Sequence, residues 1–298
     1  MIITSCGNSE GIAKKLASEL KLKYSPLTIA SFPDGDIYLK FNTELKGQKV
    51  VIVQSFFPHP DMSLFDVVFA AKTAKDLGAK KVILVAPYLG YMRQDKRFHS
   101  GECISSRVMA DLLNGSVDKL ITFDPHLHRY KSLKDIFTIP TVRLTANPLI
   151  AEFIKKQFPA KYFKNEVIIG PDWESYQWAN DIAKAVGVKA TVLEKKRLSS
   201  WHVQERMINP VPIRGRDVII VDDIISTGRT IAEAAKKAKK MGARSVMAIG
   251  VHGILIEDAL AKMHKAGVGK LVTTNCIEQP SNKIDVTPLL LQELKKER

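Results

Sequence analysis

The sequence predicts an α/β protein made of two successive lobes, each a mainly parallel β-sheet flanked by helices. The chain has 298 residues, which suits two domains of about 150 residues each better than a single core. Short β-branched runs alternate with amphipathic stretches in the first half, and the same alternation restarts near residue 145. This alternation is typical of parallel strands that helices cover on both faces.

The apolar runs give the expected order of strands. In the first half they are IIT, KVVIVQS, KKVILVAPY and KLITFD, and EGIAKKLASEL and DVVFAAKTAKDLG between them have helical spacing. In the second half they are NEVIIGPD, VKATVLEK, RDVIIVDDI, RSVMAIGV and GKLVTTN. IPTVRLTANP predicts a strand followed by a helix start at Thr145 to Pro148. We therefore expect domains at residues 1–143 and 144–282, with residues 283–298 packing back on the first domain.

The composition points to an ordinary globular protein. Hydrophobic residues make up 45% and charged residues 26%, close to the averages for soluble domains. No run approaches the roughly 18 apolar residues of a membrane span, and the first residues lack the pattern of a signal peptide. Cys6, Cys103 and Cys276 are sparse and odd in number, which suits a reducing compartment. We expect a cytoplasmic protein that does not associate with membranes.

The net charge of +14 and pI of 9.6 favour anionic partners, either phosphorylated metabolites or a nucleic acid. Many of the lysines fall on predicted outer helix faces, among them Lys236, Lys237, Lys239 and Lys240. No aromatic residues are interleaved with them, as a base-stacking surface would require. A solvated surface is therefore the favoured interpretation, and nucleic acid is not an expected partner.

The most specific motif is DVIIVDDIISTGRT at residues 217–230. An apolar strand ends there in two adjacent carboxylates, Asp222 and Asp223, which need compensating donors or positive charge. The small, hydroxyl-rich turn that follows can wrap a phosphate with backbone N–H groups, and the helix expected near Thr230 points its positive end at the same place. The segment resembles the phosphoribosyl-diphosphate binding motif. It does not say whether the phosphoribosyl group is made or consumed, because phosphoribosyltransferases share it.

No Walker A sequence and no GxGxxG motif occur in the chain, so ATP would have to bind elsewhere. Residues 87–97, PYLGYMRQDKR, follow a predicted strand directly, so Arg93 and Gln94 could lie against a polyphosphate at its carboxyl end. Residues 32–36, FPDGD, offer an aromatic ring and carboxylates for a purine. Taken alone, FPDGD is equally typical of a plain β-turn.

Three further groups of polar residues follow predicted strands. DPHLH at 124–128 and GPDWESYQWA at 170–179 make His126 and Asp172 candidates for one metal-binding pair drawn from the two lobes. A histidine ligand would be atypical for magnesium, which prefers oxygen ligands and water. LEKKRLSSWHVQER at 193–206 places Lys195 and Arg197 at a strand end before a polar stretch that could move. The alternative for this last segment is a solvated basic hairpin.

Six segments occur in the chain in this order: FPDGD, PYLGYMRQDKR, DPH, PDWESYQW, EKKR and VDDIISTGRT. With these segments the chain resembles the ribose-phosphate pyrophosphokinases over essentially its whole length. The resemblance implies two phosphoribosyltransferase-like α/β domains and Mg²⁺ dependence. It also implies a homo-oligomer, at least a dimer, in which FPDGD contributes to a neighbouring subunit's ATP site. The chain's length and its PDxES segment are closer to archaeal members, whereas the Arg229 of STGRT is also familiar from plain phosphoribosyltransferases.

The resemblance implies a reaction and a role for each matching residue. ATP and ribose 5-phosphate would be the substrates, and the β,γ-diphosphoryl group of ATP would pass to C1 of the sugar. Lys195 and Arg197 would be catalytic, and His126 and Asp172 would bind the metal. The ATP-binding residues would be Phe32, Asp34, Asp36, Arg93 and Gln94. The residues that bind ribose 5-phosphate would be Asp222, Asp223, Ser226, Thr227, Gly228, Arg229 and Thr230.

Two other functions use the same features. A type I phosphoribosyltransferase would share the phosphate-binding turn but would attach a base at C1, and it would not explain FPDGD or the RQDK segment. A non-catalytic regulator would keep the fold and bind nucleotides. The presence of Lys195, Arg197, Asp222 and Asp223 argues against a loss of catalysis.

Overall fold

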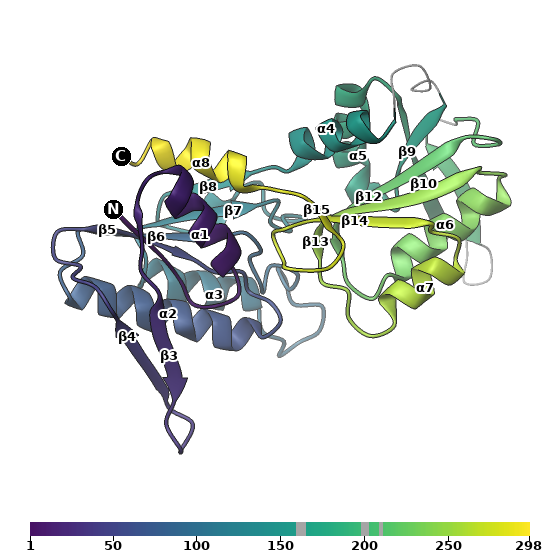
Figure 1. Ribbon diagram of the computed structural model, residues 1–298. Helices are drawn as coiled ribbons and strands as arrows, with labels where there is room; N and C mark the ends of the chain where they lie inside the picture. Colours follow the sequence, from purple (N-terminus) through teal and green to yellow (C-terminus); the bar gives the residue numbers. More distant parts are fainter. Residues whose placement is uncertain (159–164, 198–202, 209–210) are drawn as a thin grey trace. The chain divides into compact units, whose positions relative to one another are not determined.

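The computed structural model describes residues 1–158, 165–197, 203–208 and 211–298. The side chains of residues 173, 174, 177 and 193–210 lie outside the described part as well. The chain forms two units, one made of Met1–Leu144, Cys276–Glu278 and Val286–Arg298, the other of Thr145–Asn275 and Gln279–Asp285. Each unit holds one largely parallel sheet with flanking helices (Figure 1). The predicted fold class is confirmed.

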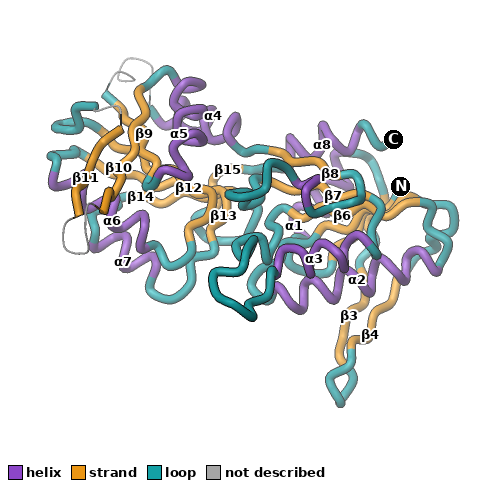
Figure 2. The backbone as a smooth tube through the Cα atoms, turned by 180° about the vertical axis from the view of Figure 1, so that it is seen from behind, coloured by secondary structure: helices purple, strands orange, loops and turns teal. Residues whose placement is uncertain are grey.

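The first unit contains a six-stranded parallel sheet in the order β2-β1-β5-β6-β7-β8. Its strands are β1 (Ile2–Ser5), β2 (Lys23–Tyr24), β5 (Lys49–Val53), β6 (Lys81–Ala86), β7 (Lys119–Phe123) and β8 (Thr141–Leu144). Its helices are α1 (Glu10–Glu19), α2 (Pro60–Asp76), α3 (Ser105–Asn114), the short η1 (Leu133–Asp135) and α8 (Thr287–Lys295). The central strands are buried almost throughout, as expected for a sheet covered on both faces. Helices α1 and α8 cover one face, and α2 and α3 cover the other (Figures 1 and 2).

A separate two-stranded sheet belongs to the first unit. Strands β3 (Leu27–Ser31) and β4 (Ile37–Phe41) pair antiparallel in register Ser31↔Ile37. The resulting hairpin extends away from the rest of the unit (Figures 1 and 2). Most of its residues are half-buried or exposed, and an isolated two-stranded hairpin is at best marginally stable in water. The hairpin therefore lacks the packing that stabilises the six-stranded sheet.

The second unit repeats the same principle with a seven-stranded sheet in the order β11-β10-β9-β12-β13-β14-β15. Its strands are β9 (Glu166–Gly170), β10 (Lys189–Arg197), β11 (Val203–Ile208), β12 (Asp217–Ile225), β13 (Ser245–Gly253), β14 (Lys270–Thr274) and β15 (Asn282–Ile284). All neighbours are parallel except β10 and β11. Its helices are α4 (Asn147–Gln157), α5 (Trp173–Val186), α6 (Arg229–Lys240) and α7 (Ala259–Lys265). The core around β12, β13 and α6 consists mostly of aliphatic side chains, with Val218, Ile220, Ile231, Ala235 and Val246 among its members.

The chain returns to the first unit at its C-terminus. Glu293 on α8 accepts a hydrogen bond of 2.9 Å from Lys119 Nζ. Glu297 accepts from Lys119 and from Lys81, each at 2.7 Å. Leu290 and Leu294 of α8 are fully buried. The last turn is therefore fixed by both apolar burial and a cluster of ion pairs on the sheet.

None of the described helices is both long enough and apolar enough to cross a lipid bilayer. Helix α2 has apolar side chains on both its exposed and its buried side. Met62, Phe65 and Phe69 are exposed. Val67, Ala70 and Ala74 are buried. Its apolar side chains therefore divide between the core and the surface.

Candidate active site

In the first unit, two loops follow neighbouring parallel strands. Residues 87–97 come directly after β6, and residues 124–130 come directly after β7. Because β6 and β7 pair side by side, both loops leave the same edge of the sheet, where ligands bind in open parallel sheets. Arg93 is exposed there, and Gln94 is half-buried and accepts a hydrogen bond of 2.7 Å from Ser105 Oγ of α3. Two of the expected ATP-binding residues are thus at a strand's carboxyl end.

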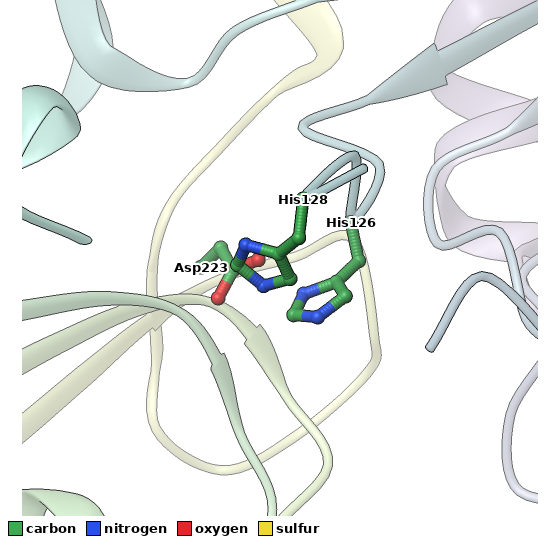
Figure 3. Close-up of side chains that lie close together, drawn as sticks. All are labelled: His126, His128 and Asp223. Carbon is green, nitrogen blue, oxygen red and sulfur yellow. The ribbon is translucent and has the colours of Figure 1, made fainter. Parts of the chain in front are cut away.

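The loop after β7 carries two histidines. The rings of His126 and His128 meet edge to face, with centroids 3.5 Å apart and planes at 84° (Figure 3). His126 is half-buried and His128 is exposed. Only His126 was expected to be a ligand from the sequence, although the HxH spacing in DPHLH already placed His128 within reach. The loop therefore offers two imidazoles. Figure 3 also labels Asp223, which belongs to the second unit.

In the second unit, carboxylates gather at the carboxyl ends of β9 and β12, which are paired in parallel. Asp222 is buried, with 8% of its surface exposed, and its Oδ1 accepts a hydrogen bond of 3.1 Å from the Asp223 backbone N–H. Burial is the main cause that raises the pKa of Asp222 well above its ordinary value, and the nearby charges of Asp223 and Asp172 add to it. A cation or hydroxyl donors bound here would relieve this electrostatic cost.

A glycine sets the geometry of the turn that follows β12. Gly228 has a φ of 68°, and a Cβ at this position would lie 3.0 Å from the backbone oxygen of Ala259. Helix α6 begins at the next residue, and no described side chain caps its first N–H groups. Uncapped N–H groups and the helix dipole together attract a phosphate. Ser226 and Thr227 are half-buried beside this helix start, whereas Arg229 and Thr230 are exposed.

Asp172 has a structural partner of its own. Its side chain accepts a hydrogen bond of 2.9 Å from the Ser175 backbone N–H, and Ser175 Oγ accepts one of 3.2 Å from the Asp172 N–H. These two bonds form a capping box at the start of α5. The carboxylate expected to bind metal therefore also holds the first turn of a helix.

The remaining expected residues lie on the two hairpins. Phe32, Asp34 and Asp36 form the tip of the β3–β4 hairpin, closed by a 2.8 Å bond from Phe32 N–H to the Asp36 carbonyl. Phe32 is 51% exposed and meets Tyr38 edge to face at 5.7 Å. The extended hairpin separates these residues from the loops that follow β6 and β7 (Figure 1).

Lys195 and Arg197 were expected at a strand end, and the structure confirms this placement. Strand β10 continues through Arg197 and pairs with β11 in register Lys195↔Glu205 and Arg197↔Val203. The backbone hydrogen bonds of this antiparallel pair extend the strand beyond its apolar part. The side chains of Lys195 and Arg197 lie outside the described residues, as does Trp201.

Comparison with known proteins decides between the candidate families. Residues 1–116 match the model of the N-terminal domain of ribose phosphate pyrophosphokinase, and residues 135–286 match the phosphoribosyl transferase domain. A ribose-phosphate pyrophosphokinase of Methanothermobacter thermautotrophicus is 35% identical over 99% of this chain and 100% of its own length. The chain belongs to the ribose-phosphate pyrophosphokinase family. A second archaeal member, from Pyrococcus furiosus, is 34% identical over 95% of this chain and 98% of its own.

The solved structures agree with this family. The crystal structure of phosphoribosylpyrophosphate synthetase from Mycobacterium smegmatis superposes with a TM-score of 0.87 at 25% identity, over 99% of this chain and 98% of that one. The resemblance to the ribose-phosphate pyrophosphokinases and the two-domain fold that it implied are therefore confirmed. The match of residues 1–116 to a model specific to these pyrophosphokinases also separates the chain from plain phosphoribosyltransferases.

Proposed function

We propose that this chain transfers the β,γ-diphosphoryl group of ATP to the C1 hydroxyl of ribose 5-phosphate, giving 5-phosphoribosyl 1-diphosphate and AMP. One observation carries the proposal beyond family membership. Strand β12 carries two adjacent carboxylates, Asp222 and Asp223, near its carboxyl end, and the turn that follows the strand leads to the uncapped start of α6. Acceptors for sugar hydroxyls and donors for a phosphate thus follow one another on a single strand and turn.

Ribose 5-phosphate would bind along this strand and turn. The 5-phosphate would accept from the backbone N–H groups at Gly228 and the start of α6, with the hydroxyls of Ser226, Thr227 and Thr230 around it. Arg229 would add positive charge. The carboxylates of Asp222 and Asp223 would accept from the ribose hydroxyls, which would replace part of the solvation that burial has removed from Asp222.

ATP would bind through the first unit. Arg93, exposed after β6, would pair with phosphate oxygens, and Gln94 would add a hydrogen bond. Phe32 would stack on adenine while Asp34 and Asp36 accept from its amine. Because the hairpin extends away from its own unit, we infer that this tip serves the ATP site of a second copy of the chain in a homo-oligomer, at least a dimer.

The carboxylates fit a magnesium ion better than the histidines do. Asp172, Asp222 and Asp223 supply the oxygen ligands that Mg²⁺ prefers, and a bound cation would offset the burial and the neighbouring charges that raise the pKa of Asp222. Asp172 and His126 would hold the ion, the histidine as a less typical ligand, and water would complete its shell. When bound with ATP, Mg²⁺ would neutralise charge on the polyphosphate.

The transfer needs no covalent intermediate. The C1 hydroxyl oxygen would attack the β-phosphorus in line, the bond from that phosphorus to the α,β-bridging oxygen would break, and AMP would leave with this oxygen. The hydroxyl proton would pass to solvent. Catalysis of this kind depends on positioning and on cations near the charge that builds up. Lys195 and Arg197 would supply these cations, in the way that an arginine finger accelerates related transfers by roughly 10³ to 10⁵.

The first test is a product assay with purified protein, ribose 5-phosphate, ATP and Mg²⁺, followed by ³¹P NMR. We expect AMP and phosphoribosyl diphosphate in equal amounts, and no turnover in Lys195→Ala although both substrates still bind. ADP as the product would mean transfer of a single phosphoryl group and would contradict the proposed reaction. No turnover together with tight binding of phosphoribosyl diphosphate would favour a type I phosphoribosyltransferase. A non-catalytic nucleotide-binding regulator would tolerate Lys195→Ala. We infer a cytoplasmic location, where these metabolites occur.

A further inference from the structure

A buried carboxylate that pairs with one cation among the described residues lies next to the expected ATP-binding residues. The side chain of Asp95 is fully buried, and Asp95 directly follows Gln94 in the chain. Its Oδ1 accepts a hydrogen bond of 2.7 Å from Arg129 Nη1, whereas its Oδ2 has no partner among the described residues. Arg129 is 41% exposed. A charge buried this deeply is strongly destabilised once its cation is removed.

The same two loops are connected a second time through a tyrosine. Tyr130 Oη donates to the Asp95 backbone carbonyl at 3.2 Å and shares a hydrogen bond of 2.9 Å with Ser106 Oγ. Ser106 Oγ also lies 3.3 Å from the Gln94 carbonyl, and its one proton is donated either to that carbonyl or to Tyr130 Oη. The loop that carries Arg93 and Gln94 is therefore held from one side by the start of α3 and from the other by the loop that carries the histidines.

Arg129 also packs beside an exposed ring of the first loop. Its guanidinium carbon lies 5.4 Å from the ring centroid of Phe98, and Lys96 Nζ lies 5.0 Å from the same centroid. Both distances are in the range of cation–π attraction. Ion pair, tyrosine bridge and ring contact thus all join residues 94–98 to residues 129–130, while His126 and His128 occupy the same loop only a few residues earlier.

We propose that Arg129 and Asp95 are positioning residues that fix the loop bearing Arg93 and Gln94 against the histidine loop, and so set the ATP site. The inference deepens the proposed function and rests on it for the identity of the ligand. Neither residue needs to touch ATP. The buried carboxylate holds the arginine, and the arginine holds the two loops in one arrangement, so that phosphate-binding groups of both loops are oriented before ATP arrives.

The test measures MgATP binding by calorimetry in the absence of ribose 5-phosphate, so that it does not depend on turnover. In Arg129→Gln we expect the Kd for MgATP to rise about tenfold, which corresponds to the loss of one charged hydrogen bond. Arg129→Lys keeps the charge and one donor and should restore most of the affinity. Arg107→Gln removes the same charge from an exposed side chain of α3 and should leave the Kd unchanged.

A double-mutant cycle with Asp95→Asn distinguishes a joint effect of Arg129 and Asp95 on MgATP binding from a general disturbance of the fold. If the pair acts as a unit, Arg129→Gln combined with Asp95→Asn should bind MgATP about as well as either single variant. In steady state, KM for MgATP should rise while KM for ribose 5-phosphate stays the same. An unchanged Kd in folded Arg129→Gln, or equal effects on both substrates, would overturn the proposal. Wild-type protein that binds MgATP but forms no product would instead contradict the proposed function and leave this inference testable.

Discussion

At the scale of single residues, the opposite ends of β12 carry aspartates in opposite electrostatic situations. Asp217, at the start, accepts two hydrogen bonds from Arg244 and one of 2.6 Å from Ser245 Oγ, and these donors lower its pKa. Asp222, near the end, has its pKa raised by burial and by neighbouring carboxylates. Asp217 therefore stabilises the fold, whereas Asp222 destabilises it and belongs to the proposed binding site.

We therefore predict opposite effects of the same substitution on one strand. At pH 7 and without ligands, Asp222→Asn should raise the melting temperature by about 2–4 °C, and Asp217→Asn should lower it by a similar amount. A raised pKa means that ionised Asp222 costs stability, and this cost disappears below pH 3.8, where the carboxyl is protonated in both states. The stability that Asp217 contributes is present above pH 3.8 and is lost as the pH falls further.

Calorimetric scans at pH 7 and pH 4 measure both effects. The difference for Asp222→Asn should be much smaller at pH 4, whereas the difference for Asp217→Asn should largely persist there and shrink only as the pH falls below 3.8. Asp222→Asn should also bind ribose 5-phosphate more weakly, whereas Asp217→Asn should not. A destabilised Asp222→Asn would contradict the electrostatic account of this site.

Sequence alone could place Asp222, Asp223 and the turn, because they are consecutive residues whose chemistry needs no distant partner. It could not find the Asp95–Arg129 pair, whose members are 34 residues apart and meet only because β6 and β7 are neighbours. It also favoured one histidine of DPHLH over the other. The ring contact of His126 and His128 depends on the backbone path of a short irregular loop, which no periodicity describes.

At the scale of elements, Asp172 has two roles that can be separated experimentally. Its carboxylate is the expected metal ligand, and it also caps α5 through Ser175. Asparagine caps helices about as well as aspartate, whereas loss of a cap costs about 1 kcal/mol. Asp172→Asn should therefore leave the free energy of unfolding within about 0.5 kcal/mol of wild type while raising the Mg²⁺ concentration needed for activity.

Ser175→Ala is the matched control, because it removes one bond of the capping box and keeps the carboxylate. It should lower the free energy of unfolding by about 1 kcal/mol with little change in the Mg²⁺ requirement. Urea unfolding and Mg²⁺ titration of the activity measure the two quantities. An unaltered Mg²⁺ requirement in Asp172→Asn would remove Asp172 from the metal site.

The predicted elements and the structure differ mainly at the hairpins. The apolar runs identified the buried parallel strands because such strands are apolar on both faces. Strands β3, β4 and β11 are partly polar, and their pairing depends on cross-strand partners such as Ser31↔Ile37 and Lys195↔Glu205. The polar stretch after Arg197 therefore suggested a segment that could move, although Val203–Ile208 form β11 through backbone pairing with β10.

At the scale of the whole molecule, the C-terminal residues stabilise the first unit through Glu297. Hydrogen bonds from Lys119 and Lys81 lower the pKa of Glu297 to about 2. We predict that Glu297→Gln lowers the free energy of unfolding of this unit by about 1–3 kcal/mol at pH 7. The loss should diminish as the pH falls from the ordinary value of 4.5 towards 2, because the carboxylate of the wild type is then protonated as well.

Amide hydrogen exchange measures the loss of stability separately in the two units. Amides of β6 and β7 should exchange faster in Glu297→Gln, while those of β12 and β13 should not change. Glu19→Gln, an exposed position on α1, serves as the control. Equal acceleration in both units would show that Glu297 does not act locally.

If the tip of the β3–β4 hairpin serves the ATP site of a second copy of the chain, two inactive variants should restore each other's activity when mixed. Phe32→Ala and Arg93→Ala should each be nearly inactive alone. After subunit exchange, about half of the dimers are mixed, and one of the two sites in each of these is intact, so that about a quarter of the wild-type activity should return. If each hairpin served its own chain, mixing the two inactive variants would recover nothing.

In the proposed reaction, the sugar's own C1 oxygen attacks the β-phosphorus of ATP. The most direct measurement uses ribose 5-phosphate labelled with ¹⁸O at C1, together with ATP and Mg²⁺, with the label located by its isotope shift in ³¹P NMR. We predict that the label appears in the diphosphate of the product, on the phosphorus joined to C1, and is absent from AMP. A product diphosphate without the label would mean that the C1–oxygen bond breaks, as in a phosphoribosyltransferase, and would contradict the proposed function.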